Sequence, residues 1–146
     1  MNGAAPAITI RYADALDAAT ITDLTNRAYV IEEAIFGEGH LRTDIEEIRA
    51  SLADAGTFFL LGESAGRVVT SVRVMHQPDG LYFSMLSIDP GVQALGLGGT
   101  MVRAVEAEAR KRGLPYVRLN CIKERNLPAY YSRLGYAPTH EERETI

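Results

Sequence analysis

A glycine-rich segment between a strand pattern and a helix pattern is the feature that most restricts the fold of this chain. An alternating pattern over 81–88 predicts a strand, Asp89 and Pro90 end it, and a helical pattern runs over 98–112. Glycines allow a tight turn and let a ligand approach the backbone amides without interference from a β-carbon. Unpaired amides and the helix dipole at a helix start favour an anion. The segment therefore predicts either a bare turn or a phosphate site, at Gln93-Ala94-Leu95-Gly96-Leu97-Gly98-Gly99-Thr100.

The pattern of the remaining chain predicts a mixed α/β fold. A strand, a helix and a second strand follow one another around the glycine-rich segment, which indicates a parallel crossover added to an antiparallel meander. Thr43 and Glu46 have the spacing of a capping box, so Thr43 is expected to cap the second helix. The expected elements are a strand over 8–12, helices over 14–28 and 43–56, strands over 58–62, 67–76 and 81–88, a helix over 98–112, a strand over 116–121 and a short helix over 128–134.

Length and composition predict one domain over 1–146 and exclude several classes of protein. The 146 residues match one ordinary domain, and a net charge of −4 gives no basic excess for nucleic acid. No apolar run is long enough to cross a membrane, and the N-terminus lacks a signal-peptide pattern, so a cytoplasmic location is expected. One cysteine, Cys121, and three histidines at scattered positions give no metal-ligand spacing.

Two familiar nucleotide-binding loops fit the glycine-rich segment poorly. A Walker-type loop needs a lysine before its Ser or Thr, and here Gly99 precedes Thr100. A dinucleotide fingerprint needs a small residue where Met101 stands, and a second βαβ unit for which the chain has no room. A generic phosphate- or nucleotide-binding domain is therefore a weaker interpretation.

The segment from Ile88 to Gly98 resembles the signature loop of the GNAT acyltransferase superfamily, Gln/Arg-x-x-Gly-x-Gly/Ala after a strand that ends in Val-x-Pro. Residues 126–136 are similar to the second motif of that family, an aromatic-Tyr pair ahead of Gly-Phe/Tyr. The order of the preceding elements also agrees, so the resemblance covers nearly the whole chain. It implies the GNAT fold, in which the central strands splay apart at their C-terminal ends and helices cover both faces of the sheet.

The C-terminal part departs from the family pattern in two ways. The spacing from Asn126 to Tyr131 is shorter than usual, and Glu124 stands where the family has its Asn. Only 12 residues follow Leu134, which is room for one final strand rather than two. We therefore expect a sheet that is one strand short, or an edge completed by a second copy in a homodimer.

The resemblance implies an acetyl-CoA site around the glycine-rich segment. The pantetheine arm would pair with the backbone of Leu86, Ser87 and Ile88 as an added strand. The Ile88 amide would hold the thioester carbonyl, and Tyr131 would protonate the departing sulfur. Asn126 would contact the cofactor, and the pyrophosphate would take amides from Gln93, Ala94, Leu95, Gly96, Leu97, Gly98, Gly99 and Thr100.

The acceptor implied by the resemblance is a primary amine of a small molecule or a peptide, and its identity is not encoded in a recognisable motif. Near pH 7 only about one lysine-like amine in 10³ is neutral, so a base must remove a proton. Glu32 and Glu33, in the segment that walls the substrate side in this family, are candidates for that base or for a cation-binding group; solvated helix-end carboxylates are the alternative. The implied activity is N-acetyl transfer by direct attack in a ternary complex, and a non-catalytic acyl-CoA-binding module is the alternative.

Overall fold

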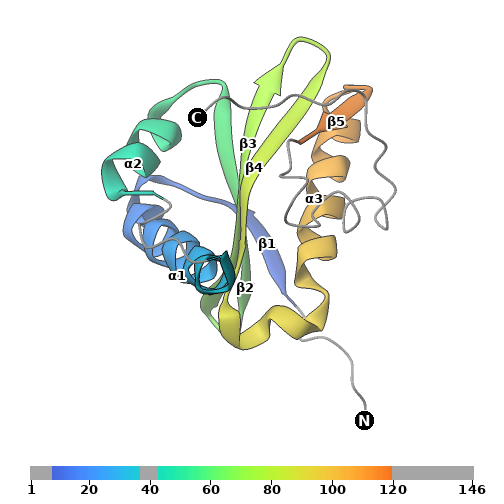
Figure 1. The fold of residues 1–146 in the computed structure, drawn as a ribbon. Helices are drawn as coiled ribbons and strands as arrows, with labels where there is room; N and C mark the ends of the chain where they lie inside the picture. Colours follow the sequence, from blue (N-terminus) through green and yellow to red (C-terminus); the bar gives the residue numbers. More distant parts are fainter. Residues whose placement is uncertain (1–7, 37–42, 120–146) are drawn as a thin grey trace.

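The computed structural model describes residues 8–36 and 43–119, which form a five-stranded sheet between two helical layers (Figure 1). The elements in chain order are β1 (Thr9–Tyr12), the 3-10 turn η1 (Ala15–Asp17), α1 (Ala18–Phe36), α2 (Ile45–Ala53), β2 (Thr57–Ser64), β3 (Arg67–Gln77), β4 (Gly80–Ile88), the 3-10 turn η2 (Pro90–Leu95), α3 (Leu97–Lys111) and β5 (Tyr116–Arg118). This order confirms the predicted mixed α/β fold and the meander of β2, β3 and β4.

The sheet has the strand order β1-β2-β3-β4-β5. The strands β1 to β4 are antiparallel to one another in sequence order, and β5 is parallel to β4. Helix α3 connects β4 to β5 and covers one face, while α1 and α2 cover the other (Figure 1). The predicted arrangement with helices on both faces is therefore confirmed.

Alternation along the strands gives the molecule one apolar core on each face of the sheet. In β2, Leu60 faces α3, whereas Phe59 and Leu61 face α1 and α2. The core under α3 is the larger one and contains Leu60, Val72, Val74, Leu81, Phe83, Met101, Val102, Val105 and Ala109. The core under α1 and α2 contains Ala18, Ile21, Ile48, Phe59 and Leu61.

The cap of α2 differs from the sequence prediction by one residue. Asp44, not Thr43, is the N-cap, and its Oδ1 accepts the Glu47 N–H at 2.9 Å. Thr43 is held by α1 instead: its N–H donates to Asn26 Oδ1 and its carbonyl oxygen accepts from Asn26 Nδ2, both at 3.0 Å. The capping-box prediction for Thr43 and Glu46 is therefore wrong, because the buried Thr43 backbone joins two helices and leaves the extended Asp44 to begin the second.

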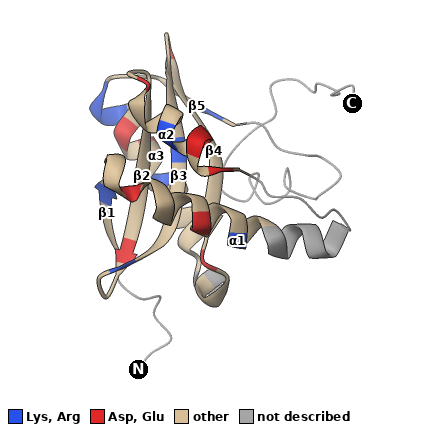
Figure 2. Ribbon diagram, turned by 90° about the vertical axis from the view of Figure 1, so that its left-hand side faces the viewer, with Lys and Arg blue, Asp and Glu red and all other residues tan. Residues whose placement is uncertain are grey.

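Charged residues of both signs lie along the described elements (Figure 2), and Arg110, Lys111 and Arg112 form a short basic run at the C-terminal end of α3. In the part of the chain that the structure describes, no helix is long and apolar enough to cross a membrane. Within the same residues, no group of three or more His, Cys, Asp and Glu is placed to hold a metal ion. The expected helix over 128–134 and the final sheet edge lie outside the described residues.

Candidate functional site

The strand β4 contains a β-bulge near its C-terminal end. Ser71 pairs with Ser87 and Arg73 with Ser84, so β4 places two residues, Met85 and Leu86, where β3 has one. Met85 adopts a φ of +54°, a left-handed conformation that is uncommon for a residue with a side chain. Bulges of this kind redirect side chains and are frequent beside active sites.

The described residues of β5 pair with the beginning of β4. Gly80 pairs with Tyr116, and the register ends where Tyr82 meets Arg118. A bidentate ion pair from Arg118 to Asp79, with distances of 2.9 and 3.0 Å, fastens β5 to the turn before β4. Among the described residues, the part of β4 beyond Tyr82 therefore has no partner on the β5 side.

The backbone at the end of β4 directs one amide toward this unpaired side. The Asp89 N–H donates to the Val69 carbonyl oxygen of β3 at 2.8 Å. Because successive residues of a strand point their N–H groups in opposite directions, the Ile88 N–H points away from β3. The Ile88 N–H thus points to the β5 side of β4, immediately before the strand ends.

The glycine-rich segment continues from β4 as the turn η2 and then the first turn of α3. Gly96 joins them with a φ of +74°, and a β-carbon there would meet nothing within 4 Å, so the backbone conformation alone requires glycine. No side chain caps α3, so the helix begins without a side-chain acceptor for its first amides. Such a helix start suits an anion.

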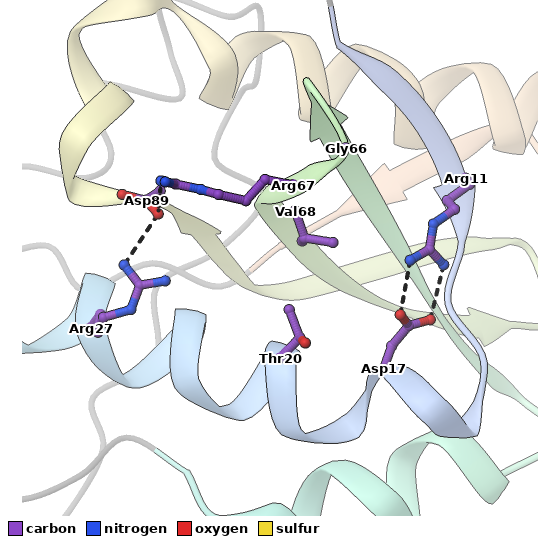
Figure 3. Close-up of a pocket in the computed structure, with 8 residues that line it drawn as sticks. All are labelled: Arg11, Asp17, Thr20, Arg27, Gly66, Arg67, Val68 and Asp89. Carbon is purple, nitrogen blue, oxygen red and sulfur yellow. Dashed lines mark hydrogen bonds and ion pairs between the residues drawn. The ribbon is translucent and has the colours of Figure 1, made fainter.

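Asp89 occupies the junction between β4 and η2, and its carboxylate is only 6% exposed. Its Oδ1 accepts the Gly91 N–H at 2.9 Å, and its Oδ2 accepts from Arg27 of α1 at 3.1 Å and Arg67 of β3 at 2.8 Å. The Gly91 amide, followed by the two arginines, holds the pKa of Asp89 below its ordinary value although burial opposes this. Figure 3 shows the cluster at one end of a hollow; its lining residues are Arg11, Asp17, Thr20, Arg27, Gly66, Arg67, Val68 and Asp89.

The other end of the same hollow contains a second, separate ion pair. Arg11 of β1 binds Asp17 through two hydrogen bonds of 2.9 and 2.8 Å, and it also reaches Glu63 at 3.1 Å. The Arg11 side chain lowers the pKa of Asp17, again against the effect of burial. This pair joins β1 to η1 and touches neither β4 nor η2 (Figure 3).

The structure brings most of the predicted donor-site residues into one continuous strand, turn and helix. Leu86, Ser87 and Ile88 form the end of β4; Gln93, Ala94 and Leu95 lie in η2; Gly96 is the junction; Leu97, Gly98, Gly99 and Thr100 begin α3. The Ser87 hydroxyl donates to the Met85 carbonyl oxygen at 3.1 Å and faces Thr25 of α1. By the same alternation of the strand, the Ser87 N–H points toward its partner Ser71 of β3.

Four of the predicted residues, Glu32, Glu33, Asn126 and Tyr131, stay predictions. Glu32 and Glu33 lie on the last turns of α1, and Asn126 and Tyr131 fall beyond the last described residue, Leu119. Sequence reasoning missed the Met85 bulge and the contacts of Asp89. The bulge leaves no local signal, whereas an Asp directly before Pro90 and Gly91 is a recognisable turn cap.

Comparison with known proteins identifies the family. A family model described as an acetyltransferase (GNAT) domain matches residues 26–145, and the chain belongs to that family. It is an acetyltransferase, and its co-substrate is acetyl-CoA. No curated protein matches the sequence.

Solved structures share the fold at low sequence identity. A Bacillus halodurans protein superposes with a TM-score of 0.77 at 14% identity, covering 94% of this chain and 98% of that one. A ribosomal-protein-alanine N-acetyltransferase from Brucella melitensis gives 0.74 at 15% identity, with coverages of 96% and 99%. A predicted acetyltransferase from Clostridium acetobutylicum, solved with acetyl-CoA, gives 0.72 at 17% identity, with 96% of each chain covered. These likenesses confirm the GNAT fold.

Proposed function

We propose that this protein transfers the acetyl group of acetyl-CoA to a primary amine by direct attack in a ternary complex. The observation that carries the proposal is the continuity of the donor site. Within residues 43–119, the end of β4 has no strand partner on the β5 side and an Ile88 N–H directed there, and it continues through η2 into a glycine-rich helix start without a side-chain cap. Acetyl-CoA has a thioester, an extended chain with amides and a diphosphate in this order, and these groups are complementary to the Ile88 N–H, the edge of β4 and the helix start.

Each part of acetyl-CoA has a role assigned to a described segment. The diphosphate binds the amides of 93–100, where the dipole of α3 favours negative charge. The pantetheine amides pair with the backbone of Leu86, Ser87 and Ile88 as an added strand. The Ile88 N–H donates to the thioester oxygen and stabilises the negative charge that develops there during attack.

The chemical step requires one proton to leave the amine and one to reach the sulfur. The neutral amine attacks the carbonyl carbon and forms a C–N bond, and the C–S bond breaks as the thiolate departs. Tyr131 donates its phenolic proton to that thiolate or orients it, and Asn126 contacts the cofactor. Glu32 or Glu33 takes the proton of the amine, directly or through water, or binds a second cationic group of the acceptor.

This chemistry defines the chemical class of the acceptor. A primary amine on a small molecule or on a peptide meets the requirement for a neutral nitrogen nucleophile. The Brucella melitensis neighbour, whose name specifies alanine N-acetylation, supports a peptide amine as one member of the panel to be tested.

The experiment that tests the proposal is a calorimetric titration with acetyl-CoA, CoA, ATP and NAD⁺, followed by thiol-release assays with a panel of amines. Selective binding of the two CoA species and amine-dependent thiol release support it. CoA binding without turnover on any amine would favour a non-catalytic acyl-CoA-binding module. Equal binding of ATP or NAD⁺ would favour a generic nucleotide-binding domain and would overturn the proposal.

A further inference from the structure

We propose that Asp89 is a positioning residue of the donor site, which holds the Ile88 amide and the start of the glycine-rich turn in place through Arg27 and Arg67. The inference rests on the proposed function, because it assigns the arrangement of a site that binds acetyl-CoA. It adds three residues that do not themselves touch the cofactor.

The backbone of Asp89 already joins the strand to the turn. Its N–H donates to Val69 of β3 at 2.8 Å, and its carbonyl oxygen accepts the Val92 N–H of η2 at 2.9 Å. Its Oδ1 accepts the Gly91 N–H at 2.9 Å. The direction of the Ile88 N–H at the end of β4 and the first turn of η2 therefore both depend on the orientation of Asp89.

The second carboxylate oxygen fixes that orientation against two other elements. Oδ2 accepts from Arg27 of α1 and from Arg67 at the beginning of β3, at 3.1 and 2.8 Å. The carboxylate is nearly buried, whereas the two arginine side chains are 45% and 67% exposed. A buried carboxylate that has lost most of its water depends on these donors, so rotation of the side chain would leave it without compensation.

Arg27 connects Asp89 to the helix that carries the candidate residues for the amine acceptor. It also pairs with Asp23 on the same helix at 2.8 Å, and α1 continues to the candidate residues Glu32 and Glu33. Asp89 thus joins the strand that would hold the acyl donor to the helix proposed to face the acceptor.

The pair of Arg11 and Asp17 supplies a matched control within the same hollow (Figure 3). Its carboxylate is also shielded, with 13% of the side chain exposed, and it also binds its arginine closely. It connects β1 to η1 and has no bond to β4 or η2. A purely structural role for Asp89 predicts similar consequences for the two carboxylates, whereas a positioning role does not.

The test compares Asp89→Asn with Asp17→Asn. Asparagine keeps the size of the side chain and an oxygen for the Gly91 N–H but removes the charge shared by the arginines. We expect Asp89→Asn to raise the KM for acetyl-CoA and the Kd for CoA about tenfold, with a smaller change in kcat. We expect Asp17→Asn to lower the Tm and leave both constants unchanged. Equal losses of Tm in the two variants, with unchanged KM and Kd, would overturn the proposal.

Two further measurements keep the outcome decisive. If Asp89→Asn does not fold, Arg67→Met, at an exposed side chain, is expected to raise the KM for acetyl-CoA about threefold, and an unchanged KM counts against the role. Amide hydrogen exchange without ligand reads the positioning directly: Gly91 and Val92 should exchange faster in Asp89→Asn than in Asp17→Asn. Failure of the wild type to bind acetyl-CoA would refute the proposed function, whereas unchanged exchange at these amides would refute the positioning role.

Discussion

The backbone of Gly80 lies directly against the carbonyl oxygen of Tyr116. A β-carbon on residue 80 would stand only 2.5 Å from that oxygen, so the close approach of β4 and β5 requires glycine. Among the described residues, this contact begins the pairing of β4 with β5, which continues to Tyr82 and Arg118. We therefore expect the width of the proposed donor site beside the end of β4 to depend on this contact.

Gly80→Ala is expected to force β5 away from β4 and to destabilise the fold by about 1–3 kcal/mol. Urea unfolding measures the loss, and the KM for acetyl-CoA should rise because the opening changes shape. Gly56→Ala is the matched control, since its β-carbon would meet an ordinary contact at 3.6 Å. Equal stabilities of the two variants would show that β5 adjusts freely.

Gly96→Ala is expected to lower the free energy of unfolding by about 1–2 kcal/mol, because alanine would have to adopt the left-handed φ of +74°. The added β-carbon itself meets no atom within 4 Å, so the cost comes from the backbone conformation alone. Gly113→Ala has the same conformational cost at the far end of α3, where φ is +71°. Titration with CoA should show weaker binding for the first variant only. Comparable weakening by both would indicate that stability, not loop geometry, governs binding.

Tyr131→Phe is expected to lower the rate of thiol release about 10²-fold while leaving CoA affinity unchanged, because a phenyl ring keeps the shape but has no proton to donate. Tyr130→Phe, at the adjacent tyrosine, should retain the activity of the wild type. If the Tyr131→Phe variant keeps the activity of the wild type, Tyr131 is not the proton donor, and water protonates the thiolate instead.

Stability is expected to fall in acid through Asp17 and Asp89. The pKa of each carboxyl is lowered in the folded state from an ordinary value of 3.8, so the unfolded chain binds protons at a higher pH than the folded chain. Their contribution is complete above about pH 5 and is lost as the pH falls through the folded values. Urea unfolding between about pH 6 and pH 3 should show a shallower decline for Asp17→Asn than for the wild type. An unchanged slope would contradict this assignment.

Local patterns were sufficient to predict the meander, the long helix α3 and the glycine-rich turn, because each has a periodicity or a turn signal of its own. The bulge at Met85 could not be predicted, since it arises from the register of β4 against β3 and from no property of methionine. Asp89 was recognisable as the end of a strand, but its arginine partners lie 62 and 22 residues away in sequence. The cap of α2 was misassigned because a long-range contact with Asn26 holds Thr43.

The order of strands in the sheet has a consequence for how the chain folds. The strands β2, β3 and β4 are joined by short turns, so their pairing closes only small loops, whereas β1 and β5 are reached through helical connections. Contacts between residues near in sequence form with the smallest loss of chain entropy. The strand β4, which carries the proposed donor site, therefore belongs to the part of the protein whose contacts form with the smallest loss of chain entropy. The contact of Tyr116 with Gly80 closes a longer loop, because it requires α3 to fold back across the sheet.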